Sequence, residues 1–169
     1  MEILEGIMSR RSIRKYSGEP VDDATVETLL RAATAAPSAG TQRSWRFVVL
    51  RDRAARERVA ACSPYAGMLP GAGVGIVVCG ETEGEKHPGY WVQDCAAAVQ
   101  NILLAAGALG LGAVWLGFHP DQGRASCCAE VLGLPATVVP LAVVSIGHPA
   151  ETKPPAERFR AEHVHTDRW

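Results

Sequence analysis

"ILLAAGALGLGAVWLGF", residues 102–118, is the closest that this chain comes to a membrane-spanning segment. The stretch carries no charge, but its length lies at the lower limit for a helix that crosses a bilayer, about 17 residues. Glycines at positions 107, 110, 112 and 117 interrupt it, and Leu-Gly-Leu-Gly at 109–112 is typical of a helix end followed by a turn. We therefore predict a buried helix followed by a buried strand, which favours a mixed fold of helices and sheet.

Helices and strands alternate on both sides of this stretch. Apolar residues at helical spacing, with capping residues before some of them, predict helices at 2–9, about 23–36, 53–62, 90–109 and 121–132. Runs rich in β-branched residues predict strands at 46–51, 74–80, 113–117 and 140–147. Long helices mixed with apolar strands predict an α/β or α+β sandwich whose sheet is covered on both faces.

Length and charge narrow the class of protein. The 169 residues fit one domain, 1–169, with a polar, proline-broken tail from about residue 148. The 17 basic and 18 acidic residues nearly cancel, so we expect no overall attraction to nucleic acid or to an anionic membrane. The first residues include an early acid and no long apolar core, so they do not resemble a signal peptide, and we expect a cytoplasmic protein.

The cysteines indicate a reducing compartment. There are five of them, an odd number, and no CxxC motif occurs. Two are adjacent and make a poor disulfide pair. We therefore expect buried free thiols at Cys62, Cys79, Cys95, Cys127 and Cys128.

Common catalytic and metal-binding motifs are absent from the sequence. The histidines are scattered, and neither CxxC nor HExxH accompanies them, so we predict no metal site. No serine lies in a GxSxG motif, and neither GxGxxG nor a P-loop motif opens a helix after a strand. The sequence therefore does not support a hydrolase, Rossmann or P-loop site.

"SRRSIRKY", residues 9–16, gathers the cations Arg10, Arg11, Arg14 and Lys15 in a chain whose net charge is -1. On an exposed helix its two pairs of like charges at i,i+4 would each cost about 0.2–0.5 kcal/mol. Cations at the end of helix 2–9 could complement the helix dipole, or they could bind an anion, most simply a phosphate. The cluster alone favours neither explanation.

"APSAGTQRSWRFVVL", residues 36–50, places a turn between a helix and a strand. This turn exposes backbone N–H and C=O groups at which a planar, polar ring could dock. Taken alone, an ordinary connector between a helix and a strand is the better interpretation.

Together these stretches resemble the nitroreductase family of FMN-dependent oxidoreductases. Four motifs match the family pattern in order, over nearly the whole chain. They are "RRSIRKY", "AAPSAG" with "RSWRFVVL", "QNILLAAGALGLGAVWLG" and "EHVHTDRW". The resemblance implies an α+β fold with a mostly antiparallel central sheet flanked by helices. It further implies a domain-swapped homodimer with FMN at the interface, in which the tail from about residue 148 wraps the partner subunit.

The resemblance also assigns roles within the FMN site. Arg10 and Ser12 correspond to phosphate and ribityl contacts, with Arg11 beside them, and Arg14 corresponds to the cation near the flavin N1/O2 edge. The turn after residue 36 corresponds to a segment of the partner subunit that packs on the ring. The end of the strand, 115–117, corresponds to the loop whose backbone amides approach the N5/O4 edge. The two arginines of the tail correspond to phosphate ligands. The remaining site residues implied are Pro37, Ser38, Ala39, Thr41, Trp115, Leu116, Gly117, Arg158 and Arg160.

The second motif departs from the family pattern. Thr41 stands where the family has Asn, Arg43 where it has Gln, and Ser44 where it has Pro, while Trp45 matches. Threonine is shorter than asparagine and cannot both donate and accept like an amide. The departure therefore affects the expected hydrogen bond to the pyrimidine edge of the flavin.

The function implied is a ping-pong oxidoreductase. NADH or NADPH would reduce FMN, which would then reduce a nitroaromatic, a quinone or a similar acceptor, so no side chain is expected to be a general acid or base. Two alternatives stay open: flavin cleavage or reductive dehalogenation on the same fold, and a flavin-binding module without turnover. Tyr65 and Met68, in loop 62–71, are candidates to line the substrate site, although packing is the better interpretation of both.

Overall fold

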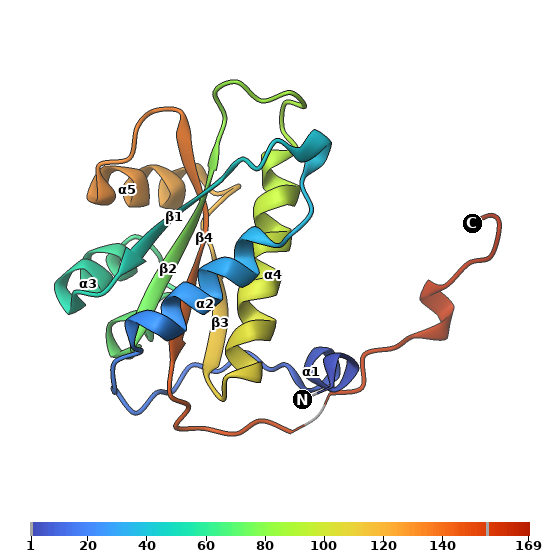
Figure 1. The fold of residues 1–169 in the computed structure, drawn as a ribbon, viewed down its shortest axis with the longest axis horizontal. Helices are drawn as coiled ribbons and strands as arrows, with labels where there is room; N and C mark the ends of the chain where they lie inside the picture. The colour runs from blue at the N-terminus through green and yellow to red at the C-terminus, as the bar shows by residue number, and fades with distance from the viewer. Residues whose placement is uncertain (1, 155) are drawn as a thin grey trace.

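Four apolar runs of the chain pair into one antiparallel sheet (Figure 1). The computed structural model describes residues 2–154 and 156–169. Within these ranges the strands are β1 (Trp45–Leu50), β2 (Val74–Glu81), β3 (Gly112–Gly117) and β4 (Val138–Gly147), in the order β1-β2-β4-β3. Each neighbouring pair is antiparallel, which confirms the predicted strands and the mostly antiparallel sheet.

Five α-helices lie in the described part of the chain: α1 (Ile3–Ser9), α2 (Asp23–Thr34), α3 (Arg53–Ala61), α4 (Trp91–Ala108) and α5 (Gln122–Leu132). Their starts follow from capping chemistry, because Asp22, Asp52 and Asp121 accept hydrogen bonds from the first free amides of α2, α3 and α5. Helix α5 ends at Gly133, which adopts the left-handed conformation that glycine tolerates. The α+β prediction is therefore confirmed.

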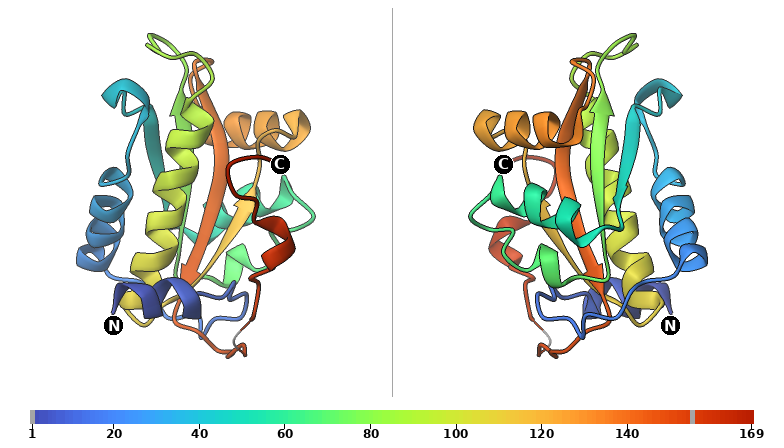
Figure 2. Two further views of the ribbon diagram at one scale, coloured as in Figure 1. Left: turned by 90° about the vertical axis from the view of Figure 1, so that its right-hand side faces the viewer. Right: turned by 90° about the vertical axis from the view of Figure 1, so that its left-hand side faces the viewer.

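Helices cover both faces of the sheet (Figure 2). On one face, α2 and α4 pack against alternate strand residues such as Ile76 and Val144. On the other face, α3 and α5 pack against the intervening residues, such as Val77 and Val143. Because side chains alternate along a strand, a sheet between two helix layers needs strands that are apolar on both faces, and β2 and β4 are apolar at nearly every position.

The stretch 102–118 forms the second half of α4, a tight turn and β3. Gly110 adopts a positive φ of 75° in the turn, and the Leu111 amide donates back to the Ala106 carbonyl at 2.8 Å. The strand then enters the sheet as an edge strand, beside β4. Among the described residues, no helix has both the length and the apolar character needed to cross a membrane.

The prediction of five free thiols was wrong for two of them. Cys62, which follows α3, forms a disulfide with Cys127 of α5 across 65 residues of sequence, while Cys79, Cys95 and Cys128 are buried and free. The pair has no local motif, because it forms only where α3 and α5 pack side by side on one face of the sheet. Burial raises the pKa of each of the three free thiols to about 12, so they stay protonated and unreactive.

We expect Cys127→Ala to lower the free energy of unfolding by about 4 kcal/mol, because the disulfide closes a long loop in the unfolded chain. Chemical denaturation of the oxidised proteins measures this loss. Cys62→Ala and the double variant should cost the same amount, since all three variants lack one and the same bond. A double variant that costs the sum of the two single variants would show that no bond joins these residues.

Candidate functional site

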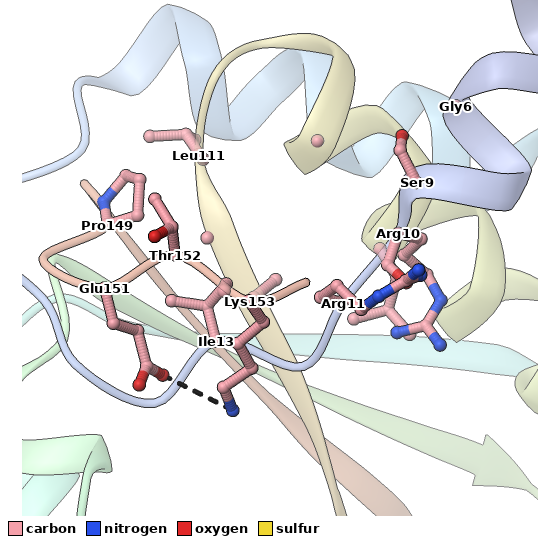
Figure 3. Close-up of a pocket in the computed structure, with 14 residues that line it drawn as sticks. Gly6, Ser9, Arg10, Arg11, Ile13, Leu111, Pro149, Glu151, Thr152 and Lys153 are labelled. Atoms are coloured by element: carbon pink, nitrogen blue, oxygen red, sulfur yellow. Dashed lines mark hydrogen bonds and ion pairs between the residues drawn. The ribbon is translucent and has the colours of Figure 1, made fainter. Parts of the chain in front are cut away.

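Arg10 and Arg11 line a pocket of about 270 Å³ at the end of α1 (Figure 3). The walls come from segments far apart in sequence: the last turns of α4, the start of β3 and the beginning of the tail. Leu103, Leu111 and Ile13 supply apolar surface, and Lys153 adds a cation from the tail. The pocket therefore joins an apolar wall to a cationic rim.

The electrostatics of this pocket favour an anion. Burial lowers the pKa of Arg10, and the positive charges of Arg158 and Arg11 lower it further. An anion that lies between these like charges would relieve the repulsion between them. Arg158 of the tail is thus close enough for its charge to act on Arg10. Arg160 follows in the same exposed segment and precedes a short 3-10 turn, Ala161–His163.

Arg11 has a structural role that the sequence did not reveal. Its Nε donates to the Pro154 carbonyl at 2.8 Å, and its Nη1 donates to the carbonyls of Met8 and Arg10 at 2.9 and 2.7 Å. These bonds tie the end of α1 to the tail. Arg11 therefore shapes the pocket, while no hydrogen bond or ion pair among the described residues holds the guanidinium of Arg10.

Glu151 and Lys153 complete the pocket, and the sequence analysis missed both. Lys153 Nζ donates to the Ser12 carbonyl at 2.5 Å and lies 3.5 Å from a Glu151 oxygen. Glu151 accepts a hydrogen bond of 2.6 Å from the Arg14 amide, and this bond, with Lys153, lowers the pKa of its carboxyl. Both residues lie in the tail, which the family resemblance predicts to wrap the partner subunit. The first residues of this tail pack on their own chain.

Strand β3 presents an open edge beside the pocket. The Ile13 amide donates to the Ala113 carbonyl at 3.0 Å, so the first motif covers the start of this edge. Further along, Trp115 is 37% exposed and Leu116 points into the core. A Cβ added at Gly117 would meet no atom within 4 Å, so the end of the strand has room for a ligand.

Two further residues surround the end of β3. Arg124 of α5 donates to the Gly117 carbonyl at 3.2 Å, pairs with Asp121 and stacks over the Tyr65 ring at 5.2 Å. Tyr65 is exposed, so it remains a candidate to line a substrate site, whereas Met68 packs against the core on the α3 and α5 face. The packing interpretation is thus confirmed for Met68.

The turn that contains Pro37, Ser38 and Ala39 lies at the other end of α4. These three residues and the first turns of α4 line an open hollow of about 270 Å³. Ser38 accepts a hydrogen bond from the Arg43 amide at 3.1 Å, which closes the turn. Asp94 of α4 is buried beneath the turn and accepts a hydrogen bond of 2.9 Å from the Ala39 amide.

The backbone of this turn is strained. Gly40, Thr41 and Arg43 have positive φ values of 52°, 58° and 52°. For β-branched Thr41 such a conformation costs on the order of 1–3 kcal/mol, and asparagine tolerates it better. The departure of Thr41 from the family pattern therefore affects the conformation of the turn as well as its hydrogen bonding.

One chain alone does not bring all the predicted site residues together. The pocket of Arg10 lies at the C-terminal end of α4 and the turn of Ser38 at its N-terminal end (Figure 1), about 27 Å apart along an 18-residue helix. The start of β3 and the beginning of the tail belong to the first group. Among the described residues, no three His, Cys, Asp or Glu side chains gather as metal ligands.

Comparison with known proteins identifies the family. The model of the Nitroreductase family matches residues 7–64 and 60–148. A protein of Archaeoglobus fulgidus named "Putative NADH dehydrogenase/NAD(P)H nitroreductase" is 43% identical over 172 residues, which cover 99% of each sequence. A crystal structure of a protein of the same name from Parabacteroides distasonis has a TM-score of 0.95 at 38% identity, over 99% of this chain and 98% of that one.

A second solved structure carries a ligand. It is described as a nitroreductase from Desulfovibrio desulfuricans in complex with FMN, and it has a TM-score of 0.87 at 36% identity, over 100% of this chain and 98% of that one. The similarity thus extends over the pocket, the open edge of β3 and the strained turn alike. Because the family model matches most of the chain and these relatives extend over nearly all of it, this protein belongs to the nitroreductase family.

Proposed function

We propose that this protein is an FMN-dependent oxidoreductase that takes a hydride from NADH or NADPH and reduces nitroaromatic, quinone or similar acceptors by a ping-pong mechanism. The observation that supports this most is the cationic pocket of Arg10, which opens beside the free edge of β3. A phosphate and a flat ring joined by a chain need this combination of surfaces. A related nitroreductase is described in complex with FMN.

The residues present fit FMN. The phosphate would lie between Arg10 and Arg158, whose mutual repulsion it would relieve. The ribityl chain would follow Ser12 along the start of β3, and the ring would lie over Trp115 and Gly117, where the strand end has room. When bound, FMN supplies the hydride chemistry, and the chain supplies position and electrostatics.

Arg14 is the cation we assign to the N1/O2 edge of the ring. Its side chain is exposed and its amide is held by Glu151, so the backbone of the first motif is fixed while the guanidinium stays available. A cation there stabilises the negative charge of the reduced flavin and raises its reduction potential. No general acid or base is needed in this role.

The working unit we propose is a homodimer in the cytoplasm. No described residue of α1 is buried, and Ile3, Leu4 and Met8 expose apolar side chains beside a groove of about 380 Å³ between α1, α2 and α4. The tail beyond residue 156 leaves the body of the molecule (Figure 1) and exposes Phe159 and Trp169. A partner subunit that covers these surfaces, wrapped by the tail, would also bring its own Ser38 turn to the FMN site.

Purified protein should be yellow, and NADH or NADPH should bleach its flavin absorbance under anaerobic conditions. A nitroaromatic or quinone added afterwards should restore the absorbance. Protein that takes up no FMN would contradict the proposal. A flavin that neither nicotinamide reduces would favour a binding module without turnover, and halide release or flavin breakdown would favour the dehalogenation or flavin-cleavage alternative.

The cations of the first motif should separate by role. Arg10→Ala should weaken FMN binding by about tenfold or more, because a charge-assisted bond to phosphate is lost. Arg14→Ala should keep FMN but lower its reduction potential. Lys15→Ala, whose side chain is exposed, is the control and should change neither quantity. Equilibrium dialysis and a potentiometric titration measure the two effects, and equal effects of all three variants would contradict the assignment.

Ile3→Glu should convert a dimer into monomers, because it places a carboxylate in the apolar groove beside α1. Light scattering after size-exclusion chromatography measures the change in mass, and the flavin absorbance of the monomer peak should fall with it. Glu5→Gln on the same helix is the control and should stay dimeric. A monomeric wild-type protein that holds FMN firmly would contradict the proposed assembly.

A further inference from the structure

We propose that Asp94 is a positioning residue for the flavin, and that it acts on the site of the partner subunit through the turn of residues 38–42. The inference rests on the proposed function, and it gives a role to a residue that the proposed FMN site does not otherwise use. Asp94 lies in the first turn of α4, and the residue is 3% exposed.

Both carboxylate oxygens of Asp94 bind the turn. Oδ1 accepts from the Ala39 amide at 2.9 Å, and Oδ2 accepts from Gln42 Nε2 at 2.9 Å. These two bonds bracket Gly40 and Thr41, the two successive residues with positive φ. Asp94 therefore holds the strained part of the turn from both sides.

The far end of Gln42 is also fixed. Its Oε1 accepts a hydrogen bond from the His87 amide at 3.2 Å, so the side-chain amide of Gln42 cannot reverse without loss of that bond. The His87 ring lies against Gly40, where an added Cβ would come within 2.5 Å of Nε2. Asp94, Gln42 and His87 thus form one chain of contacts under the turn.

Capping of α4 does not explain why the carboxylate is there. The amide of Trp91, the first residue of α4, donates to Glu85, so another acid already caps the helix. Among the ion pairs of the described residues none involves Asp94, and a buried carboxylate without a cation is costly. Strained backbone persists only where its surroundings hold it, and strain of this kind gathers at ligand sites.

Asp94→Asn tests the polarity of these bonds. An asparagine oxygen can serve the Ala39 amide, but its NH₂ then faces the NH₂ of Gln42, which must either stay unpaired or turn away from His87. We expect FMN affinity to fall about tenfold, together with a changed reduction potential and faster amide exchange at residues 39–42.

Gln42→Glu supplies the matched variants. In the double variant Asp94→Asn/Gln42→Glu, the new carboxylate accepts from the introduced asparagine NH₂ and from the His87 amide, and the net charge is that of the wild type. We expect the double variant to bind FMN within about twofold of the wild type, although Gln42→Glu alone, with two facing carboxylates, binds it weakly. An Asp94→Asn protein that melts earlier but keeps the affinity and potential of the wild type would show a structural role only, and would overturn the proposal.

Mixed dimers test whether Asp94 acts across the interface. One chain carries Arg10→Ala and the other carries Asp94→Asn, with different tags for purification. If each site takes Arg10 from one chain and the turn from the other, one site of the mixed dimer has both defects and the other has none. We therefore expect one high-affinity FMN per mixed dimer, although neither variant homodimer has any.

The other results are equally decisive. A mixed dimer without a high-affinity site would mean that Arg10 and Asp94 serve the same site from the same chain, and would overturn the proposal. A wild-type protein that binds no FMN would instead refute the proposed function itself, before any variant is compared. Restored binding in Asp94→Asn/Gln42→Glu excludes misfolding as the cause of the defect in Asp94→Asn.

Discussion

Burial of α4 against the antiparallel sheet is the constraint on which the rest depends. The helix is apolar enough to fill the layer between α2 and the sheet, and its two ends carry the two halves of the candidate site. At its C-terminal end it forms the wall of the Arg10 pocket, and at its N-terminal end Asp94 holds the strained turn. Since a helix of this length is rigid, it keeps the two halves apart within one chain. This separation supports the proposal that FMN lies between two chains.

Much of the fold followed from local patterns. The apolar stretch at 102–118, the aspartate caps and the β-branched runs predicted each long element to within about two residues, because hydrophobic periodicity is the dominant sequence pattern. The disulfide between Cys62 and Cys127 could not be predicted in this way. It depends on the packing of α3 beside α5, and nothing near either cysteine in sequence indicates its partner.

The candidate site was only partly predictable. The cation cluster stood out in sequence, because clustered like charges are unusual in a nearly neutral chain, whereas the turn gained a role only from the family resemblance. Lys153 and Glu151 did not stand out, since a polar tail gives no indication of which residues return to the body. Asp94 was visible as a polar residue in an apolar helix, yet its role depends on Gln42 and on the left-handed backbone at Thr41. Such a role appears only in three dimensions.

The most direct test of this account is a crystal structure of the protein with FMN. We expect a dimer in which the phosphate lies between Arg10 and Arg158 of one chain, while the ring lies between residues 115–117 of that chain and the turn of residues 37–41 from the partner. A flavin enclosed by a single chain, or one bound away from the edge of β3, would contradict it.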